Sequence, residues 1–260
     1  MIDDSSPSDW RDLQAGVCRL FNDIGLSADV EVELPTPRGR VVVDVFATDE
    51  KSVDKITYIV ECKNWSSAIP KTVVHAFTTV MQETGVNIGY IVSQHGLQSG
   101  AEEYTHNTNI TGLTYQALQK RYFNVWWQRY FCVAAASAAD SAHQYVEPIN
   151  SFRERIVVTL DPEAQTHFRR LQAKYASFVL LVQFMNIGSI IPQYLSAAPI
   201  DIALYKQNVG ELLGDPNFFQ ANYYRDLLVE VSSKLVSIEG EFNSLFGRNI
   251  FLPGNLPHLL

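Results

Sequence analysis

The stretch RVVVDVFATDEKSVDKITYIVECK, residues 40–63, decides how the first half of the chain is expected to fold. Its first eight and last eight residues are apolar runs rich in β-branched side chains, and a charged loop separates them. Runs of this kind predict strands that other elements cover on both faces. Each run also carries charge, with Asp44 in the first and Glu61 and Lys63 in the second. The stretch therefore predicts two buried strands with ionisable residues in their interior.

Further elements extend this pair of strands in both directions. Apolar residues at three- and four-residue steps predict helices, and alternating or continuous β-branched runs predict strands. In chain order we expect a helix at 9–24, strands at 28–34, 40–47 and 56–63, a helix at 71–83, a strand at 88–93, a helix at 99–107 and a strand at 110–114. This order predicts an α/β fold with an αβββαβ core, in which the helix after the third strand crosses over to the fourth.

The remaining chain changes to a mostly helical pattern. An unbroken run of helix-compatible residues predicts one long helix over 115–139. Asp161 and Pro162 predict the start of a second helix, as N-cap and first helical residue. A third helix is expected over 218–246, and an interruption at Gly240 is left open.

The domain organisation follows from this change of pattern. We expect a first domain over residues 1–139, a linker at 140–150 and a mostly α-helical C-terminal region over 151–260. No motif in the C-terminal region indicates its role.

Composition is that of a folded globular protein, with 47% hydrophobic and 18% charged residues. The three cysteines are widely spaced, which favours reduced thiols. The sequence begins without a basic, then apolar, leader and contains no apolar run near the roughly 20 residues of a membrane span. We therefore expect a cytoplasmic protein with no membrane association.

The charge balance opposes tight, unaided binding to DNA. Net charge is −8, and residues 1–130 contribute −5, from 11 basic and 16 acidic residues. Nucleic-acid binders usually present a basic surface, because their affinity comes largely from neutralised phosphates. The balance does not exclude a nuclease, since metal-binding carboxylates add negative charge that a bound cation offsets.

The charged residues inside the two strands suit a metal-dependent hydrolase. Residues two apart on a strand share a face, so Glu61 and Lys63 project together and Cys62 points into the opposite layer. Asp44 lies among valines, where an ionised carboxylate is costly unless it is paired or metal-bound. If the strands are neighbours, Asp44 and Glu61 converge on one divalent cation such as Mg²⁺. Lys63 would then orient or help deprotonate the attacking water and stabilise charge on a phosphate.

A simpler interpretation of the same residues stays open. Glu-x-Lys is common on strands, and the pair formed by Glu61 and Lys63 can be an ordinary surface ion pair. Asp44 can be a strand-end carboxylate satisfied by the backbone or by an arginine such as Arg40. The apolar surroundings of both carboxylates favour the metal site.

The residues also resemble the signature of a known superfamily. The spacing is similar to the D…(D/E)-x-K motif of PD-(D/E)xK phosphodiesterases, with Asp44 followed, after a gap of 16 residues, by Glu61-Cys62-Lys63. The segments VDVFA, YIVECKNW, VVHAFTTVM, NIGYIVSQHGLQSGAEEYT and ITGLTY resemble the catalytic domain of Mrr-like restriction endonucleases. The resemblance covers about residues 9–116. It implies a restriction-endonuclease-like mixed sheet flanked by helices.

The resemblance also implies roles for these residues. Asp44 and Glu61 would be ligands of Mg²⁺, for which Mn²⁺ can substitute, Cys62 would offer its carbonyl oxygen, and Lys63 would be catalytic. Val43 stands where the motif's name places a proline, a common departure in the superfamily.

Two residues are auxiliary candidates. Relatives often carry an acidic residue early in the first helix. Arg11 stands nearest that position here, so the neighbouring Asp12 is the substitute, or the chain binds fewer metals. His75 stands where relatives often carry a glutamine, although a lone helical histidine is more often a surface or packing residue. His95 follows the fourth strand, where a plain loop residue is the more common interpretation.

Other residues are candidates for substrate or partner contacts. Three basic residues flank the candidate strands and can contact phosphates, namely Arg38, Arg40 and Lys71. It is equally open that these residues are isolated, solvated charges. The aromatic run 122–131 suggests base stacking. Its helical spacing favours a packing face between domains or protomers instead, and hence a homo-oligomer.

The function expected from the sequence is that of a Mg²⁺-dependent DNA endonuclease. A role in restriction or phage defence is implied by the resemblance alone. Two alternatives stay open: an inactive nuclease-fold module that acts through protein contacts, and a DNA-repair or junction-resolving nuclease.

Overall fold

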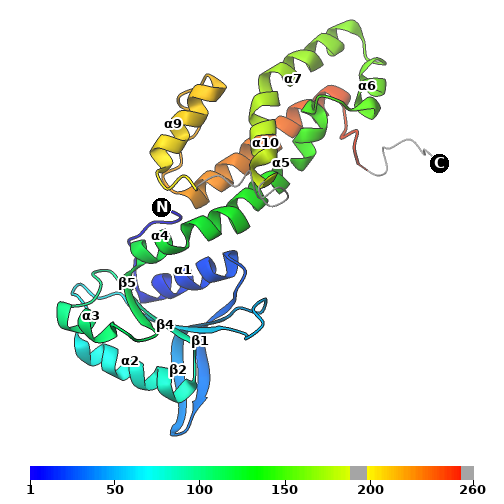
Figure 1. Ribbon diagram of the computed structural model, residues 1–260. Coiled ribbons are helices and arrows are strands. Elements are labelled where there is room, and N and C mark those ends of the chain that lie inside the picture. Colours follow the sequence, from blue (N-terminus) through cyan, green and yellow to red (C-terminus); the bar gives the residue numbers. More distant parts are fainter. Residues whose placement is uncertain (188–197, 253–260) are drawn as a thin grey trace. The chain divides into compact units, whose positions relative to one another are not determined.

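In the computed structural model, which describes residues 1–187 and 198–252, the chain divides into two units, Met1–Arg129 and Tyr130–Leu260 (Figure 1). Residues 188–197 and 253–260 of the predicted C-terminal region lie outside the described residues. The first unit contains, in chain order, α1 (Trp10–Asp23), β1 (Ser27–Thr36), β2 (Gly39–Thr48), β3 (Thr57–Lys63), α2 (Lys71–Thr84), β4 (Ile88–Ser93), α3 (Ser99–Thr105), β5 (Ile110–Thr114) and α4 (Tyr115–Trp126). These elements confirm the predicted αβββαβ order.

The sheet of this unit is mixed, with strand order β1-β2-β3-β4-β5. β1, β2 and β3 pair antiparallel, and β3, β4 and β5 pair parallel. Since α2 joins the parallel strands β3 and β4, it makes the predicted crossover. The parallel pairing places the carboxyl ends of β3 and β4 side by side, with Lys63 opposite Ser93.

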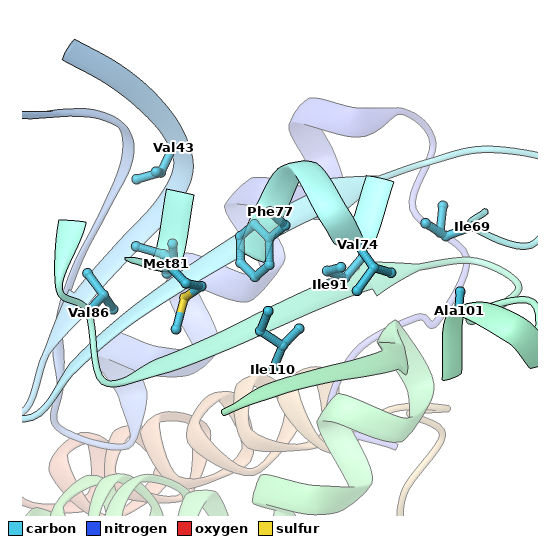
Figure 2. Close-up of a cluster of buried hydrophobic side chains, with 10 residues drawn as sticks. Val43, Ile69, Val74, Phe77, Met81, Val86, Ile91, Ala101 and Ile110 are labelled. Carbon is cyan, nitrogen blue, oxygen red and sulfur yellow. The ribbon is translucent and has the colours of Figure 1, made fainter. Parts of the chain in front are cut away.

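Helices cover both faces of the sheet. On one face, Val74, Phe77 and Met81 of α2 and Ala101 of α3 join strand residues such as Ile91 in a buried apolar cluster (Figure 2). On the other face lie α1 and α4. There Phe21 packs against the rings of strand and helix tyrosines, namely Tyr58, Tyr90 and Tyr122. The hydroxyls of Tyr90 and Tyr122 are hydrogen-bonded at 2.9 Å. Strands β3 and β4 therefore have no exposed residue, as the apolar runs predict. The prediction of cover on both faces is wrong for the first part of β2, where Val42 is 62% exposed.

Helix α1 begins where the sequence places a capping residue. The Asp9 side chain accepts the backbone N–H of Asp12 at 2.9 Å, which satisfies one of the unpaired donors of the first turn. Leu13, Val17 and other residues of its apolar stripe are buried. Trp10 differs from the expectation, because it is 40% exposed although it shares the helical spacing of that stripe.

The second unit is helical within its described residues. It contains α5 (Cys132–Val146), α6 (Ser151–Val157), α7 (Pro162–Gln183), the 3₁₀-helix η2 (Phe184–Asn186), α9 (Ile202–Leu213) and α10 (Tyr224–Phe246), while the π-helix η1 (Trp127–Phe131) contains the boundary between the units. Helices α5, α7 and α10 contact one another. Their core includes Tyr145 stacked on Phe242, with ring centroids 4.8 Å apart. Among the described residues no helix combines the length and apolar character of a membrane span.

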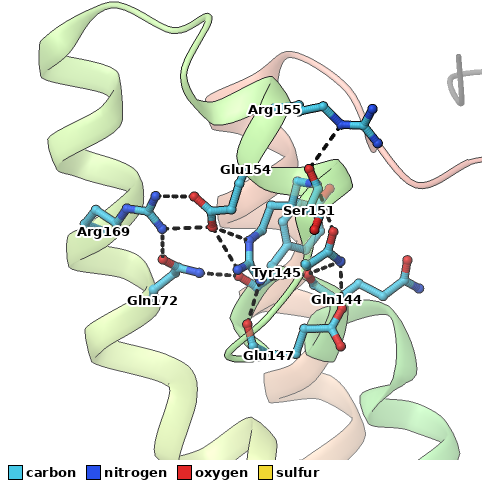
Figure 3. A network of polar contacts seen from close by, with 10 residues as sticks. Gln144, Tyr145, Glu147, Ser151, Glu154, Arg155, Arg169 and Gln172 are labelled. Carbon is cyan, nitrogen blue, oxygen red and sulfur yellow. Dashed lines mark hydrogen bonds and ion pairs between the residues drawn. The ribbon is translucent and has the colours of Figure 1, made fainter.

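A network of polar contacts joins α5, α6 and α7, with Gln144, Glu154 and Arg169 among its members (Figure 3). Arg153 is 2% exposed and donates to the carbonyl oxygens of Gln144 at 3.2 Å and Glu147 at 2.9 Å. Its remaining N–H groups bind the Glu154 carboxylate, which Arg169 of α7 also binds. Because a buried charge must be paired and hydrogen-bonded, this network fixes the path of the chain between the helices.

Two expectations for the helical part differ from the structure. The helix predicted over 115–139 contains the π-helix η1 and continues to Val146. The linker predicted at 140–150 is therefore mostly helix, because no glycine or proline stands between Cys132 and Glu147 to end α5, and the units divide after Arg129. The interruption left open at Gly240 does not occur. Helix α10 runs through this residue, at a cost of about 1 kcal/mol relative to alanine that the packing of the helix outweighs.

Candidate active site

Asp44 lies where the pairing of β2 is interrupted on both sides. The β2–β3 ladder ends at the pair Val45 and Val60, and the β1–β2 ladder omits Asp44 and its facing residue Glu31. Glu31 has a φ of 53°, in the left-handed region that residues other than glycine rarely adopt. The interruption lets the Asp44 side chain take the place of a ladder bond.

The Asp44 carboxylate bridges to the neighbouring strand. Its Oδ2 accepts the backbone N–H of Cys62 at 2.7 Å, a short, charge-assisted hydrogen bond. Of the two partners considered for Asp44, the structure has the backbone, whereas Arg40 binds Glu33 across the β1–β2 pair at 2.9 Å. The strands β2 and β3 are thus neighbours, as the metal-site interpretation requires.

Glu61 and Lys63 lie on one face of β3 and form an ion pair. Their side chains are 27% and 24% exposed, so water screens the pair only in part. Burial by itself would lower the pKa of Lys63, but the hydrogen bond from Lys63 to Glu61 and the charges of Glu61 and Asp44 raise it above its ordinary value. Lys63 is therefore a cation at neutral pH. The structure brings Asp44, Glu61 and Lys63 into one electrostatic group.

Cys62 points into the opposite layer and is buried. Burial first, and then the charges of Asp44 and Glu61, raise the pKa of its thiol well above the ordinary value. Without a bound cation the thiol is therefore neutral. The oxygen donor that Cys62 offers is its backbone carbonyl.

A pocket of about 400 Å³ opens beside these groups. It is lined by residues from the start of α1, from β2 and from the end of β3, namely Ser8, Asp9, Trp10, Asp44, Cys62, Lys63, Asn64 and Trp65. Glu61 does not line this pocket, but it forms an ion pair with Lys63, which does. The Asn64 side chain accepts a hydrogen bond from Gln94 at 2.6 Å, which joins the segments that follow β3 and β4.

The donor set fits a hard divalent cation. Within the described ranges no three His, Cys, Asp or Glu side chains gather closely enough to hold a metal by themselves. Mg²⁺ does not need such a cage, because it usually keeps several waters and binds one or two carboxylates together with substrate phosphate. Asp44, Glu61 and the Cys62 carbonyl are oxygen donors of this kind.

The auxiliary candidates lie elsewhere. The Asp12 carboxylate accepts the backbone N–H of Ser8 at 2.9 Å, and it is Asp9, one turn earlier, that lines the pocket. His75 is exposed and its ring lies 4.1 Å from that of Tyr104 on α3, which supports the packing interpretation. His95 is an exposed loop residue.

The candidate phosphate contacts are spread over the surface. Arg38 binds Glu83 at the end of α2 at 2.9 Å, and Arg40 binds Glu33. Both arginines therefore stabilise the end of the β1–β2 hairpin. Lys71 lies over the ring of Tyr104 at 5.3 Å. None of the three lines the pocket.

Sequence reasoning missed the pocket residues outside the motif, above all Asp9, Trp10 and Trp65. A signal existed for Trp65, because it follows the Glu61-Cys62-Lys63 strand by two residues. Nothing in the sequence indicates that the start of α1 lies against the same pocket, since that depends on how the helix crosses the sheet.

Residues 6–122 match the sequence model of the family Mrr_cat, described as restriction endonuclease. Among curated proteins, none has a significant sequence match. One solved structure, titled "Crystal Structure of Protein of Unknown Function AF1548", aligns at 13% identity with a TM-score of 0.35, over 88% of this chain and 98% of that one. A likeness at this level is too weak to support an argument about fold or function.

Proposed function

Residues 6–122 belong to the Mrr-type restriction endonuclease family, and we propose that Asp44, Glu61 and Lys63 make this domain a divalent-metal-dependent DNA endonuclease. The observation that carries the proposal is the hydrogen bond from the Cys62 backbone to Asp44, at 2.7 Å. It holds one carboxylate of β2 against the β3 segment that presents the Glu61–Lys63 ion pair. Two acids and one cation at adjacent strands suit phosphodiester hydrolysis.

Each residue has a defined task in this proposal. Asp44, Glu61 and the Cys62 carbonyl would hold Mg²⁺ or Mn²⁺, which supplies Lewis-acid stabilisation of the phosphate and a more acidic bound water. Lys63, which lines the pocket, would act as a cation beside the phosphate. It would stabilise the negative charge that develops on the phosphate and orient the attacking water by hydrogen bonding.

Two wider assignments belong to the proposal as well. A role in restriction or phage defence is suggested by the family, and DNA repair or junction cleavage would use the same chemistry. Assembly into a homo-oligomer is a further proposal. The competing function, a nuclease-fold module that does not cut, is favoured by the charge of −5 over residues 1–130. Retention of the two acids and the lysine in one electrostatic group favours the enzyme.

The test is cleavage of plasmid DNA by the full chain with Mg²⁺ or Mn²⁺. We expect metal-dependent cutting that a chelator abolishes and that Lys63→Ala reduces by about 100-fold or more, as for loss of one preorganised donor at a reacting centre. Lys55→Ala is the matched control, because Lys55 also forms an ion pair, with Glu50, but in a loop outside the pocket. It should cut like the wild type.

The proposal fails in either of two cases. One is full activity of a folded Lys63→Ala variant. The other is absence of cutting by the wild type with either metal on supercoiled, linear and methylated DNA, which would favour the non-cutting module.

A further inference from the structure

Two of the four tryptophans are exposed, and both line the candidate active-site pocket. Trp10 is 40% exposed and Trp65 is 42% exposed, whereas Trp126 and Trp127 are buried. Single exposed apolar residues are ordinary on protein surfaces and need no explanation. Two large aromatic side chains that come from different elements and border one pocket are not explained in this way, because each leaves much apolar area in water.

Each tryptophan comes to the pocket for a separate structural reason. Trp10 is the first residue of α1, directly after the capping residue Asp9, so its ring lies beyond the buried stripe of the helix. Trp65 follows the end of β3, in the segment that Gln94 ties to Asn64 at 2.6 Å. The two rings therefore border the pocket from the ends of two regular elements, both of which are fixed by capping or pairing.

Cationic groups accompany the rings. The Arg11 guanidinium lies 4.4 Å from the centroid of the Trp10 ring, and Lys63 lines the pocket next to Trp65. Arg11 forms no ion pair with any residue that the structure describes. An aromatic surface beside a cation is the arrangement with which proteins hold a nucleotide, by stacking on the base and neutralising its phosphate.

The charge of the first unit restricts what can occupy this pocket. With 16 acidic and 11 basic residues in 1–130, broad attraction of duplex phosphates is weak. Stacking does not depend on net charge, because every base has a π-face. A base inside a duplex is already stacked and cannot reach the rings, whereas an unpaired or extruded base can.

We propose that Trp10 and Trp65 bind an unpaired nucleobase of the DNA substrate next to the scissile phosphate, so that the site prefers DNA with a bulged, extruded or single-stranded base. This inference rests on the proposed function, since it takes the phosphate at Lys63 as the point of cleavage. A pocket of about 400 Å³ falls in the range of sites that hold small organic groups.

The test is equilibrium binding of two short DNA duplexes of the same sequence, one with a single bulged base and one fully paired. Binding by the full wild-type chain, and by the tryptophan variants made in it, is followed by fluorescence anisotropy in the presence of a chelator, so that cutting does not interfere. We expect tighter binding of the bulged duplex. Trp65→Ala and Trp10→Ala should each weaken that binding by about 5- to 100-fold and change binding of the paired duplex by less than about 2-fold.

Matched variants separate stacking from folding. Trp65→Tyr retains an aromatic ring and should keep most of the preference for the bulged duplex, while Val53→Ala, at a side chain 97% exposed outside the pocket, should keep all of it. Free dAMP is the competitor that tests a small-molecule site. It should displace the bulged duplex only at concentrations at least about 100-fold above those of the duplex, because it lacks the flanking phosphates.

Three results would overturn the inference. These are equal binding of the two duplexes by the parent protein, equal weakening of both duplexes by the tryptophan variants, and binding of dAMP as tight as that of the bulged duplex. The binding assay does not require cutting, so its outcome is independent of the cleavage test. A chain that discriminates the bulge but never cuts keeps the binding of the unpaired base at the tryptophans and loses the nuclease proposal, and one that cuts without discriminating does the reverse.

Discussion

Asp44 has two roles in the proposed site, and two substitutions separate them. Its carboxylate accepts the backbone N–H of buried Cys62, and it is a proposed metal ligand. Asp44→Ala leaves that N–H without an acceptor, which costs about 1–3 kcal/mol. Asp44→Asn keeps an acceptor oxygen in place and loses only the assistance of the charge. We therefore expect it to stay within about 1 kcal/mol of the wild type.

The two variants should differ in thermal stability but not in activity. At about 2–4 °C per kcal/mol for a chain of this size, a loss of about 2 kcal/mol lowers the Tm of Asp44→Ala by roughly 4–8 °C. Both variants should lose about 100-fold or more of the cutting rate, because a bound metal contributes several kcal/mol to the transition state. Circular dichroism melts and plasmid cleavage with Mg²⁺ measure the two effects.

Asp54→Ala, at an exposed aspartate of the β2–β3 loop, is the control and should change neither quantity. The structural role assigned to the hydrogen bond is wrong if Asp44→Ala has the same Tm as Asp44→Asn. The role as metal ligand is wrong if Asp44→Asn cuts at the rate of the wild type.

Two further predictions concern the fold. Gly89→Ala would place a Cβ 2.7 Å from Cε1 of Phe77 in the core of Figure 2, so we expect the free energy of unfolding, measured by chemical denaturation, to fall by about 1–3 kcal/mol. Gly100→Ala, with no atom within 4 Å of the added carbon, should not destabilise the protein. Equal stability of the two variants would contradict this packing. The hydrogen bond from Arg169 is the main reason that the pKa of Glu154 is lowered to about 2, below its ordinary 4.5. The resulting stabilisation is present above about pH 4.5 and is lost as the pH falls through the folded-state pKa. The Tm difference between the wild type and Glu154→Gln should therefore narrow from about pH 5 toward pH 2, and a constant difference would refute the assignment.

The elements of the first unit could be predicted because their signals are local. The run of residues 40–63 contains two apolar strands separated by a charged loop, and β3 has no exposed residue, as predicted, whereas β2 is buried mainly at alternate residues and leaves Val42 62% exposed. The short loop between the two strands made antiparallel neighbours the simplest arrangement, and this arrangement brings Asp44 to Glu61 and Lys63. The convergence of these three residues thus follows from the periodicity of the strands and from the short connection between them.

The boundary between the units could not be predicted in the same way. Residues 132–146 are helix-forming throughout, and nothing in their composition marks the π-helix at Trp127–Phe131 that precedes them. A boundary inside a continuous helical run leaves no loop signal. The segment expected to be a linker, 140–150, is helical as far as Val146, since no glycine or proline precedes Pro148 there to end the helix.

The arrangement of the pocket depends on tertiary structure for a different reason. Trp10 has the spacing of a core residue in α1, and only its place at the first turn of the helix exposes it. Asp9, expected as the first residue of the helix at 9–24, is instead its N-cap and also lines the pocket. One side chain can satisfy a helix terminus and border a site at once, so a local explanation does not exclude a functional one.

The acidic charge of the first unit and its proposed activity on DNA can be reconciled through the positions of its basic residues. Several of them are engaged by carboxylates, with Arg19 bound to Asp3, Arg38 to Glu83, Arg40 to Glu33 and Lys55 to Glu50. Arg11, which forms no ion pair among the described residues, lies over the Trp10 ring, and Lys63, which is paired with Glu61, lines the pocket together with Trp65. Affinity that depends on a few local cations and on stacking falls less steeply with salt than affinity spread over many phosphates. A negative net charge weakens binding to paired and bulged DNA alike, because both carry phosphates, so stacking of an unpaired base would supply a larger share of the total affinity at the proposed site. Under this proposal the acidic charge favours selectivity for the unpaired base and does not argue against a nuclease.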